Sequence, residues 1–418
     1  MRHGLRATAA SLGLALLFTA GCGGRGGGED DREVRIDVDK PVAYADEPVR
    51  IRVTGLAAGR EATVVSKATD FSGVSWTGRA TFAADEKGVV DPTRAAPKGG
   101  TYRTADGMGL FWSMNPDRGP ADEATFVARW PEEQPSYDIR LEVHVDGERV
   151  ASRALTRTWM REGVTHRALS VAGDGVKGSL YVPPADVPRR PPVLSFGGSN
   201  GGVGDKHAAA LLASRGHPVL TLCYFGCPER PDELERIELE YFAKAARLLN
   251  RTYGTGSRRA SVIGYSRGSE AAQLLAHHYP DLVHDVVVYA PSQNTHRAFP
   301  DSKQPAWTKG GKPVEHRPIP LDRVRGTVLA IAGDADGLWP SAVGARDIGE
   351  RRGASGGRHR ALVYPGAGHG VGMFPYTSIG LRYRSPLIEG TVSMGGTRQA
   401  DARAKADGWP RVLDLLGG

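Results

Sequence analysis

The chain has 418 residues, with 54 Lys and Arg against 47 Asp and Glu and a formal net charge of +7. This length makes two domains the default expectation. The positive charge is mild and spread along the chain, without a Lys/Arg block interleaved with aromatic residues, which argues against nucleic-acid binding.

The first 33 residues have the character of a targeting segment followed by a tether. Arg2 and Arg6 precede an apolar run over residues 7–20 that is too short to span a bilayer, which predicts a signal peptide over residues 1–21. The run ends in Thr-Ala-Gly before Cys22 and resembles the lipobox of bacterial lipoproteins, although Thr19 replaces the usual aliphatic residue. Cys22 is therefore predicted to be lipidated and to anchor the protein at the outer side of the cell membrane. A plain secretory signal is the alternative. Residues 22–33 are expected to form a flexible tether.

Residues 34–155 are predicted to form a β-sandwich of immunoglobulin-like character. Apolar and polar residues alternate over 34–38, 49–53 and 139–145, turn residues such as Asp146-Gly147 separate the segments, and long helical patterns are absent.

From residue 166 to residue 418 the pattern changes to strands that alternate with helices. This predicts an α/β domain with a mostly parallel sheet covered on both faces. Helices are expected over residues 205–215 and 233–250, and residues 292–325 are expected to form a loop-rich insertion that could be part of a lid. The apolar runs expected as strands are 178–182, 192–196, 218–222, 260–263, 286–289, 328–331 and 361–364.

The most informative motif is G-x-S-x-G at residues 264–268. It follows an apolar run and opens a helical pattern at residues 271–276, so that strand, tight turn and helix follow one another. Such a turn presents the serine hydroxyl to a base. A lone G-x-S-x-G is weak evidence, but this context predicts that Ser266 is the nucleophile of an acyl hydrolase with the α/β-hydrolase fold.

A serine nucleophile needs a histidine base, and that histidine needs a carboxylate to hold its tautomer. In this fold they follow the serine in the order acid, then histidine. His369, in a Gly-rich loop after a predicted strand, is the expected base. Asp334 and Asp336 both follow the preceding strand, and the spacing from Gly333 favours Asp336 as the acid. The parallel sheet would bring both loops to one edge.

Three other histidines are less suited to that role. His207 opens a predicted helix and is a weaker rival for the base. His277 and His278 lie on the helix after the nucleophile and are expected to be structural.

An oxyanion in this fold is held by two backbone N–H groups. One is expected from Arg267, which follows the nucleophile, and the other from Gly198 or Ser199 in the Gly-rich loop 197–202. A phosphate-binding loop is disfavoured, because neither G-x-G-x-x-G nor a following Gly-Lys-Ser/Thr is present.

Two further cysteines, Cys223 and Cys227, are four positions apart. Export would permit a disulfide between them, and two buried thiols are the alternative. No second Cys/His pair stands at ligand spacing, so no metal site is predicted, and no cofactor is implied.

Several segments resemble type I acyl-CoA thioesterases and bile acid-CoA:amino acid N-acyltransferases. The most specific of them is Gly-Met-Gly-Leu-Phe-Trp-Ser-Met at residues 107–114. The others are residues 73–82, 88–92, 96–102, 240–242, 264–268, 318–321, 366–369 and 394–404. The resemblance covers residues 34–417 and implies a thioester-cleaving α/β-hydrolase domain behind a β-sandwich domain.

The resemblance also carries residue roles. The family's nucleophile falls on Ser266, its base on His369 and its acid on Asp336, although the local sequence departs from the usual Asp-Asp-His-Asn-Trp stretch and is aligned there by Trp339. The N-acyltransferases of the family use cysteine as nucleophile and the thioesterases use serine, so Ser266 favours hydrolysis of a small-molecule acyl thioester of the acyl-CoA type.

Two alternatives remain open at this point. Acyl-CoA is a cytosolic metabolite, so an exported enzyme could instead be an esterase or acyltransferase that acts on lipid or other acyl esters. A binding protein without catalytic activity is the second alternative, and an intact Ser-Asp-His set argues against it. No oligomeric state is predicted.

Overall fold

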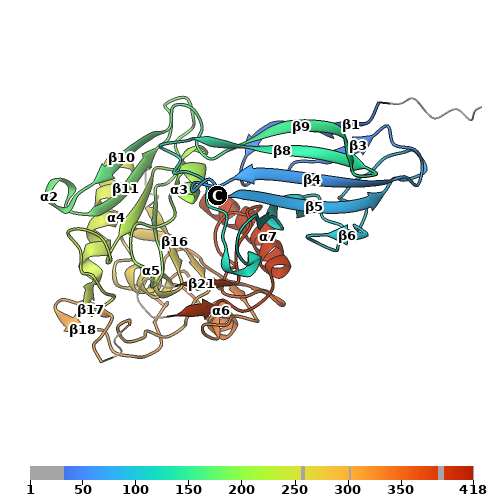
Figure 1. Ribbon diagram of the computed structural model, residues 1–418. Coiled ribbons are helices and arrows are strands. Elements are labelled where there is room, and N and C mark those ends of the chain that lie inside the picture. The colour runs from blue at the N-terminus through green and yellow to red at the C-terminus, as the bar shows by residue number, and fades with distance from the viewer. Residues whose placement is uncertain (1–32, 256–258, 301–302, 385–389, 418) are drawn as a thin grey trace, which may run out of the picture.

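The computed structural model describes residues 33–255, 259–300, 303–384 and 390–417. The predicted signal peptide, the lipidation site Cys22 and the tether up to residue 32 lie outside the described residues. Figure 1 shows a β-rich lobe beside an α/β lobe. Within the described ranges, no helix has both the length and the apolar character needed to cross a membrane.

The β-rich lobe contains one large sheet in the strand order β2-β9-β8-β4-β5-β6, with β7 paired to β5, and a separate ribbon of β1 and β3. All pairs are antiparallel except β2 with β9. The elements are β1 (Arg35–Val38), β2 (Val42–Tyr44), β3 (Ile51–Thr54), β4 (Glu61–Thr69), β5 (Ser75–Ala83), β6 (Gly99–Gly100), α1 (Gly109–Trp112), β7 (Asn115–Pro116), η1 (Ala121–Glu123), β8 (Ser136–Val145) and β9 (Glu148–Thr158).

The two sheets of this lobe share one core. Ile36 and Val53 from the ribbon are buried in the same cluster as Val64 and Leu141 from the large sheet. The alternation along these strands places every second side chain in that core, which is why the β-sandwich could be predicted. The two sheets are unequal in size.

The α/β lobe is built on an eight-stranded sheet in the order β10-β11-β13-β12-β15-β16-β19-β20. The pairs β10–β11 and β11–β13 are antiparallel, and every pair from β13 to β20 is parallel. The strands are β10 (Thr165–Leu169), β11 (Lys177–Val182), β12 (Val193–Phe196), β13 (Val219–Cys223), β15 (Ala260–Tyr265), β16 (Val283–Tyr289), β19 (Val328–Gly333) and β20 (Arg360–Tyr364). This mostly parallel sheet confirms the predicted α/β-hydrolase fold.

Helices cover both faces of this sheet, as the burial of both faces of its central strands β12 and β13 requires. Side chains of α4, α5 and α6 share one buried cluster with the strands, and those of α3 and α7 share the cluster on the opposite face. The helices of this lobe are α2 (Val171–Asp174), α3 (Lys206–Ala213), α4 (Leu239–Tyr253), α5 (Arg267–His278), α6 (Ser341–Glu350) and α7 (Arg398–Gly417).

The helix predicted over residues 233–250 was wrong at its start. The chain enters α4 only at Leu239, because Ile237 and Glu238 form the short strand β14 (Ile237–Glu238), which pairs in parallel with β17 (Trp307–Lys309). The partner strand lies in the insertion over 292–325, about 70 residues away in the sequence. Tertiary pairing therefore overrides the helical periodicity.

The insertion itself is packed onto the lobe rather than detached from it. It carries β17 and β18 (Lys312–Pro313), and Trp307, Ile319 and Leu321 are buried in the core beside α4. A second small ribbon, β21 (Arg382–Arg384) with β22 (Thr391–Ser393), precedes α7.

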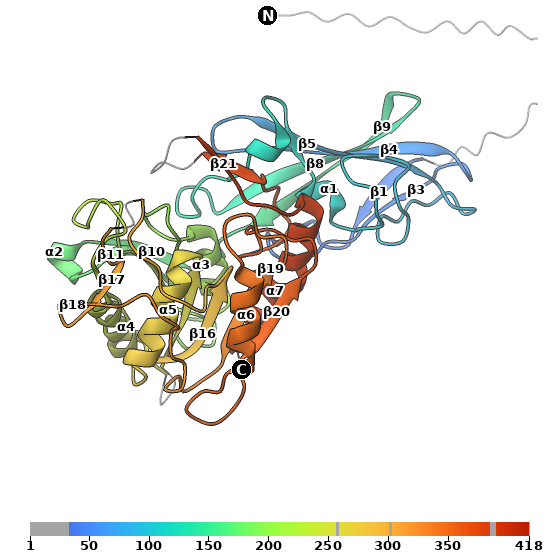
Figure 2. The same ribbon diagram turned by 90° about the horizontal axis from the view of Figure 1, so that it is seen from below.

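Helix α7 joins the two lobes (Figure 1, Figure 2). The Trp409 indole N–H donates to Asp46 of the β-rich lobe at 2.6 Å, and Arg398 donates to the Met114 carbonyl at 2.6 Å. Arg215, after α3, donates to the other Asp46 oxygen at 2.8 Å. Because Asp46 is buried, its two charge-assisted hydrogen bonds stabilise the contact between the two lobes.

Candidate active site

Ser266 occupies a strained turn between β15 and α5. Its φ is +53°, a left-handed value that non-glycine residues rarely adopt, and it precedes the first residue of the helix. The flanking glycines permit this turn: a Cβ on Gly264 would lie 2.4 Å from the Gly268 carbonyl oxygen, and one on Gly268 would lie 2.2 Å from the Gly197 oxygen. The motif therefore forms the strand-turn-helix geometry predicted from its sequence.

His369 and Asp336 lie together beyond the carboxyl ends of β20 and β19. His369 Nδ1 is 2.8 Å from Asp336 Oδ2, and both side chains are 2% exposed. Asp336 also accepts from the backbone N–H of Leu338 at 2.9 Å and from the Ser341 hydroxyl at 2.5 Å. With Nδ1 donating to the carboxylate, Nε2 is left as the acceptor that a general base needs.

Asp334 occupies a different position. Its carboxylate accepts from the Gly366 N–H at 2.7 Å and so ties together the turns after β19 and β20. Of the two acids that the sequence left open, Asp336 is the one beside His369.

Tyr265 connects the turn at Ser266 to the histidine loop. Its hydroxyl donates to the His369 carbonyl at 2.6 Å, and the two rings are 5.4 Å apart. Burial raises the pKa of Tyr265, so its hydroxyl remains a donor at neutral pH. In the described part of the chain, the Ser266 hydroxyl makes no direct hydrogen bond to His369.

The Gly-rich loop after β12 lies against Ser266. A Cβ on Gly198 would be 2.8 Å from the Ser266 Cβ. The Tyr224 hydroxyl stabilises this loop as a hydrogen-bond donor. It lies 3.1 Å from the Gly197 carbonyl oxygen and 2.9 Å from that of Gly198. The N–H groups of Gly198 and Ser199 donate to no other described residue, so both are available to an oxyanion.

A buried carboxylate under the turn was missed in the sequence. Glu270 is fully buried, lies 2.9 Å from Arg267 Nε, and accepts from the Trp307 indole at 2.7 Å and from the His296 N–H at 3.0 Å. His296 in turn stacks on Trp339 beside His369. Through these bonds Glu270 connects the insertion over residues 292–325 to the first turn of α5. No signal in the sequence pointed to this role, because the partners of Glu270 come from distant segments.

Asp401 on α7 supports the histidine loop from the other side. It is 3% exposed and accepts from the Gly368 N–H at 2.6 Å, while its second oxygen has no hydrogen-bond partner among the described residues. Burial raises the pKa of Asp401 from 3.8 to about 6.

We expect this carboxylate to make stability depend on pH. Between pH 4 and pH 6 the folded protein retains the Asp401 proton that the unfolded chain has lost, so stability falls as the pH rises. A pKa raised by about two units corresponds to roughly 3 kcal/mol. Relative to the Asp401→Asn variant, the free energy of unfolding of the wild type should therefore drop by about that amount between pH 4 and pH 7 in urea titrations. Asp414→Asn, at an exposed position of the same helix, is the matched control, and a difference that stays constant with pH would contradict the assignment.

The remaining predicted residues have structural surroundings. His207 is buried, its Nε2 lies 3.0 Å from the Arg129 carbonyl, and its ring packs on Trp159. His277 lies 3.4 Å from Asp322 at the end of α5. His278 packs beside His277. Cys223 and Cys227 form a disulfide, which was one of the two alternatives predicted from the sequence.

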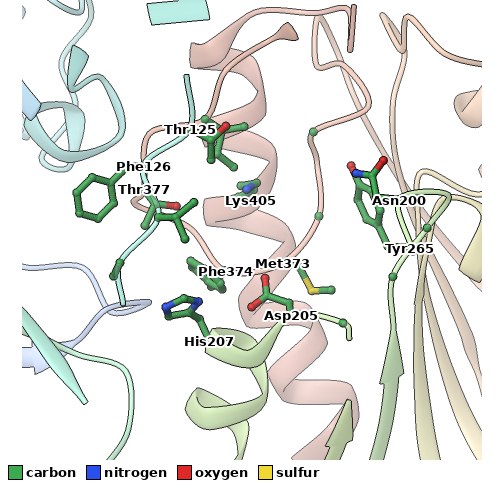
Figure 3. A pocket seen from close by; sticks show the side chains of 18 of the residues that line it. Thr125, Phe126, Asn200, Asp205, His207, Tyr265, Met373, Phe374, Thr377 and Lys405 are labelled. Atoms are coloured by element: carbon green, nitrogen blue, oxygen red, sulfur yellow. The ribbon is translucent and has the colours of Figure 1, made fainter. Parts of the chain in front are cut away.

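A cavity of about 430 Å³ opens between the two lobes beside the turn (Figure 3). Gly198 and Tyr265 line it, and its wall includes Phe126 and Trp159 from the β-rich lobe and Phe374 from the segment between β20 and β21. This size lies in the range of small-molecule sites, and the apolar wall suits an acyl chain.

Comparison with known proteins gives consistent results. The family model described as the acyl-CoA thioester hydrolase/BAAT N-terminal region matches residues 46–171, and the model of the BAAT/acyl-CoA thioester hydrolase C terminus matches residues 302–417. Acyl-coenzyme A thioesterase 6 of Mus musculus is 29% identical over 396 residues, 88% of this chain and 92% of its own. The peroxisomal succinyl-coenzyme A thioesterase of Mus musculus is 27% identical over 402 residues, 89% of this chain and 93% of its own.

Among solved structures, a dienelactone hydrolase-like promiscuous phosphotriesterase from metagenomic libraries aligns with a TM-score of 0.39 and 16% identity. The alignment covers 61% of this chain and all of that one.

Proposed function

Because the chain belongs to the acyl-CoA thioester hydrolase/BAAT family, we propose that it hydrolyses acyl thioesters of the acyl-CoA type through an acyl-Ser266 intermediate. The observation that carries this proposal is the hydrogen bond of 2.8 Å between His369 and Asp336, on a loop that Tyr265 ties to the turn at Ser266. Serine rather than cysteine as nucleophile favours release of the acyl group to water.

In the first half of the reaction the Ser266 Oγ attacks the thioester carbonyl carbon while His369 Nε2 takes the hydroxyl proton. The carbonyl oxygen becomes an oxyanion held by the N–H of Arg267 and that of Gly198 or Ser199. The C–S bond then breaks, and the leaving thiolate takes the proton from His369. Asp336 keeps the imidazole oriented and stabilises its cationic form.

In the second half a water molecule attacks the acyl ester, and His369 takes its proton. The bond between the acyl carbon and Ser266 Oγ breaks, the hydroxyl regains the proton, and a carboxylic acid leaves. The hydrogen bond between Ser266 and His369 is inferred to form with substrate bound, since such bonds are often loose in an empty site.

The proposal is tested by trapping the intermediate. Turnover of hexanoyl-CoA by the mature protein is quenched in acid, and the digest is examined by mass spectrometry. A hexanoyl group on the peptide that contains Ser266 is expected. Hydrolysis of p-nitrophenyl esters without hydrolysis of acyl-CoA would instead favour the esterase alternative. Absence of both activities would favour a binding protein.

We also propose that Cys22 carries the membrane anchor, on the strength of the lipobox-like sequence before it. Cells that express the full chain and are fed an alkyne-tagged fatty acid should label the protein, and Cys22→Ala should remove the label. Equal labelling of both forms would contradict the lipid anchor.

A further inference from the structure

The loop that is proposed to hold the oxyanion is bonded to a buried tyrosine. Tyr224 directly follows β13 and is 1% exposed. Its hydroxyl lies 2.9 Å from the Gly198 carbonyl oxygen and 3.1 Å from that of Gly197. One hydroxyl proton is therefore shared between two consecutive carbonyls in a three-centre hydrogen bond. Burial raises the pKa of Tyr224, so the hydroxyl remains a donor at neutral pH.

These two carbonyls determine where the candidate oxyanion donors point. The Gly197 carbonyl and the Gly198 N–H belong to one peptide group, and the Gly198 carbonyl and the Ser199 N–H belong to the next. Among the described residues Phe299–Pro300 is the only cis peptide bond, so both groups are trans. In a trans peptide group the C=O and N–H bonds point in opposite directions. The hydrogen bonds to Tyr224 therefore direct both N–H groups away from its hydroxyl.

Tyr224 and the cavity lie on different sides of this loop. Tyr224 belongs to the core cluster of the α/β lobe, where its ring packs among three aromatic side chains, Phe196, Phe242 and Trp307. Gly197 and Gly198 instead line the inter-lobe cavity. A Cβ on Gly198 would lie 3.4 Å from the Ser266 hydroxyl oxygen. N–H groups that point away from the core side thus face the space beside Ser266, where the oxyanion would form.

The segment that carries Tyr224, residues 223–227, also contacts the end of the Gly-rich loop 197–202. The Phe225 carbonyl accepts from the Gly202 N–H at 2.9 Å. The disulfide closes the segment by joining its first and last residues. Such a closure restricts the conformations that the segment can adopt. Tyr224 is therefore held in place by its aromatic neighbours and by a covalent link.

We propose that Tyr224 is a positioning residue for the reaction, because its hydroxyl orients the N–H groups of Gly198 and Ser199 toward the oxyanion. This inference rests on the proposed function. Tyr224 touches no reacting atom and acts through the two peptide groups. A hydrogen bond to a carbonyl also polarises its peptide group, which strengthens the N–H at the other end as a donor. The benefit is largest where negative charge develops, so kcat rather than KM should depend on this hydroxyl.

The first test is Tyr224→Phe, which removes the hydroxyl and keeps the ring in its aromatic surroundings. Loss of a complete oxyanion donor costs roughly 10²–10³-fold in kcat. Weakening of two donors should lower kcat for hexanoyl-CoA about 10- to 100-fold and leave KM nearly unchanged. An unchanged kcat, or a rise in KM that accounts for the whole loss of kcat/KM, would overturn the inference.

The matched control is Tyr181→Phe. Tyr181 in β11 is equally buried, and its hydroxyl donates to Glu132 at 2.7 Å, an acid that keeps Lys206 as a second partner. Each variant loses the hydrogen bonds of one buried tyrosine hydroxyl, so urea titrations should show comparable losses of stability. Tyr181→Phe should nevertheless leave kcat close to that of the wild type. An equal fall of kcat in both variants would assign the effect to stability and contradict a positioning role.

The second test measures stabilisation of the oxyanion without turnover. When hexyl trifluoromethyl ketone binds, the Ser266 oxygen adds to its carbonyl carbon, His369 takes the hydroxyl proton, and the carbonyl oxygen becomes an oxyanion. Hexyl methyl ketone has the same chain and remains a neutral carbonyl compound. The wild type should bind the trifluoromethyl ketone more tightly in calorimetric titrations. Tyr224→Phe should reduce this preference about 10- to 100-fold and leave the affinity for the methyl ketone unchanged.

The outcomes of this test separate the inference from the proposed function. Equal binding of the two ketones by the wild type would mean that Ser266 forms no adduct, and the acyl-serine mechanism would fall together with the role of Tyr224. If the wild type preferred the trifluoromethyl ketone and Tyr224→Phe kept the full preference, only the role of Tyr224 would be refuted. A preference that is lost in Tyr224→Phe would support this role even if acyl-CoA were not hydrolysed.

Discussion

Replacing Ser266 with alanine should lower kcat for acyl-CoA hydrolysis by about 10⁴-fold or more. The variant removes the only atom that forms the acyl ester, and loss of a serine nucleophile in comparable sites costs up to about 10⁶-fold. The backbone φ of +53° is strained for alanine as it is for serine, so correct folding of the variant should be verified by circular dichroism. Single-turnover measurements with hexanoyl-CoA give the rate.

The matched control is Ser269→Ala. Ser269 lies one turn further along α5, is fully buried, and its hydroxyl has no hydrogen-bond partner among the described residues. Its removal should leave both stability and turnover close to those of the wild type. If Ser266→Ala retained wild-type turnover, the acyl-serine mechanism would have to be abandoned.

Replacing Asp336 with asparagine should lower kcat by about 10⁴-fold, the loss known for the same change in a serine protease triad. The amide would present a donor to His369 Nδ1, so the imidazole would adopt the tautomer with a proton on Nε2 and could not accept from Ser266. Asparagine is nearly isosteric, and its carbonyl oxygen can still accept from the Leu338 N–H. A pH–rate profile separates a wrong tautomer from a loss of structure.

Asp334→Asn serves as the control for that experiment. Its oxygen can still accept the Gly366 N–H, so turnover should change by less than about tenfold. The opposite result, with Asp334→Asn inactive and Asp336→Asn active, would identify Asp334 rather than Asp336 as the catalytic acid.

The local features of the site could be predicted from the sequence. The apolar run before residue 264, the glycines on either side of Ser266 and the helical pattern after it are close in sequence, so one segment contains the whole turn. The chain order Ser266, Asp336, His369 reflects a parallel sheet whose strand ends share one edge, which is why His369 and Asp336 could be paired before their distance was known.

Features that depend on distant partners could not be predicted in this way. The start of α4 was misplaced because Ile237 pairs with Trp307. Glu270 was passed over because its partners come from residues 296 and 307 in the insertion. The place of His207 in the cavity wall depends on Trp159 from the other lobe.

The amino-acid sequence by itself determined the strand-turn-helix at Ser266, the two-lobed α/β-hydrolase architecture and the identity of the residues that can act as base and acid, because these follow from local periodicity, glycine positions and chain order. Only the tertiary structure decided that Asp336 rather than Asp334 meets His369 and that the lobes enclose a cavity with Lys405 in its wall. Burial and hydrogen-bond partners depend on packing between segments far apart in the chain, and a single sequence does not encode those contacts in any local pattern.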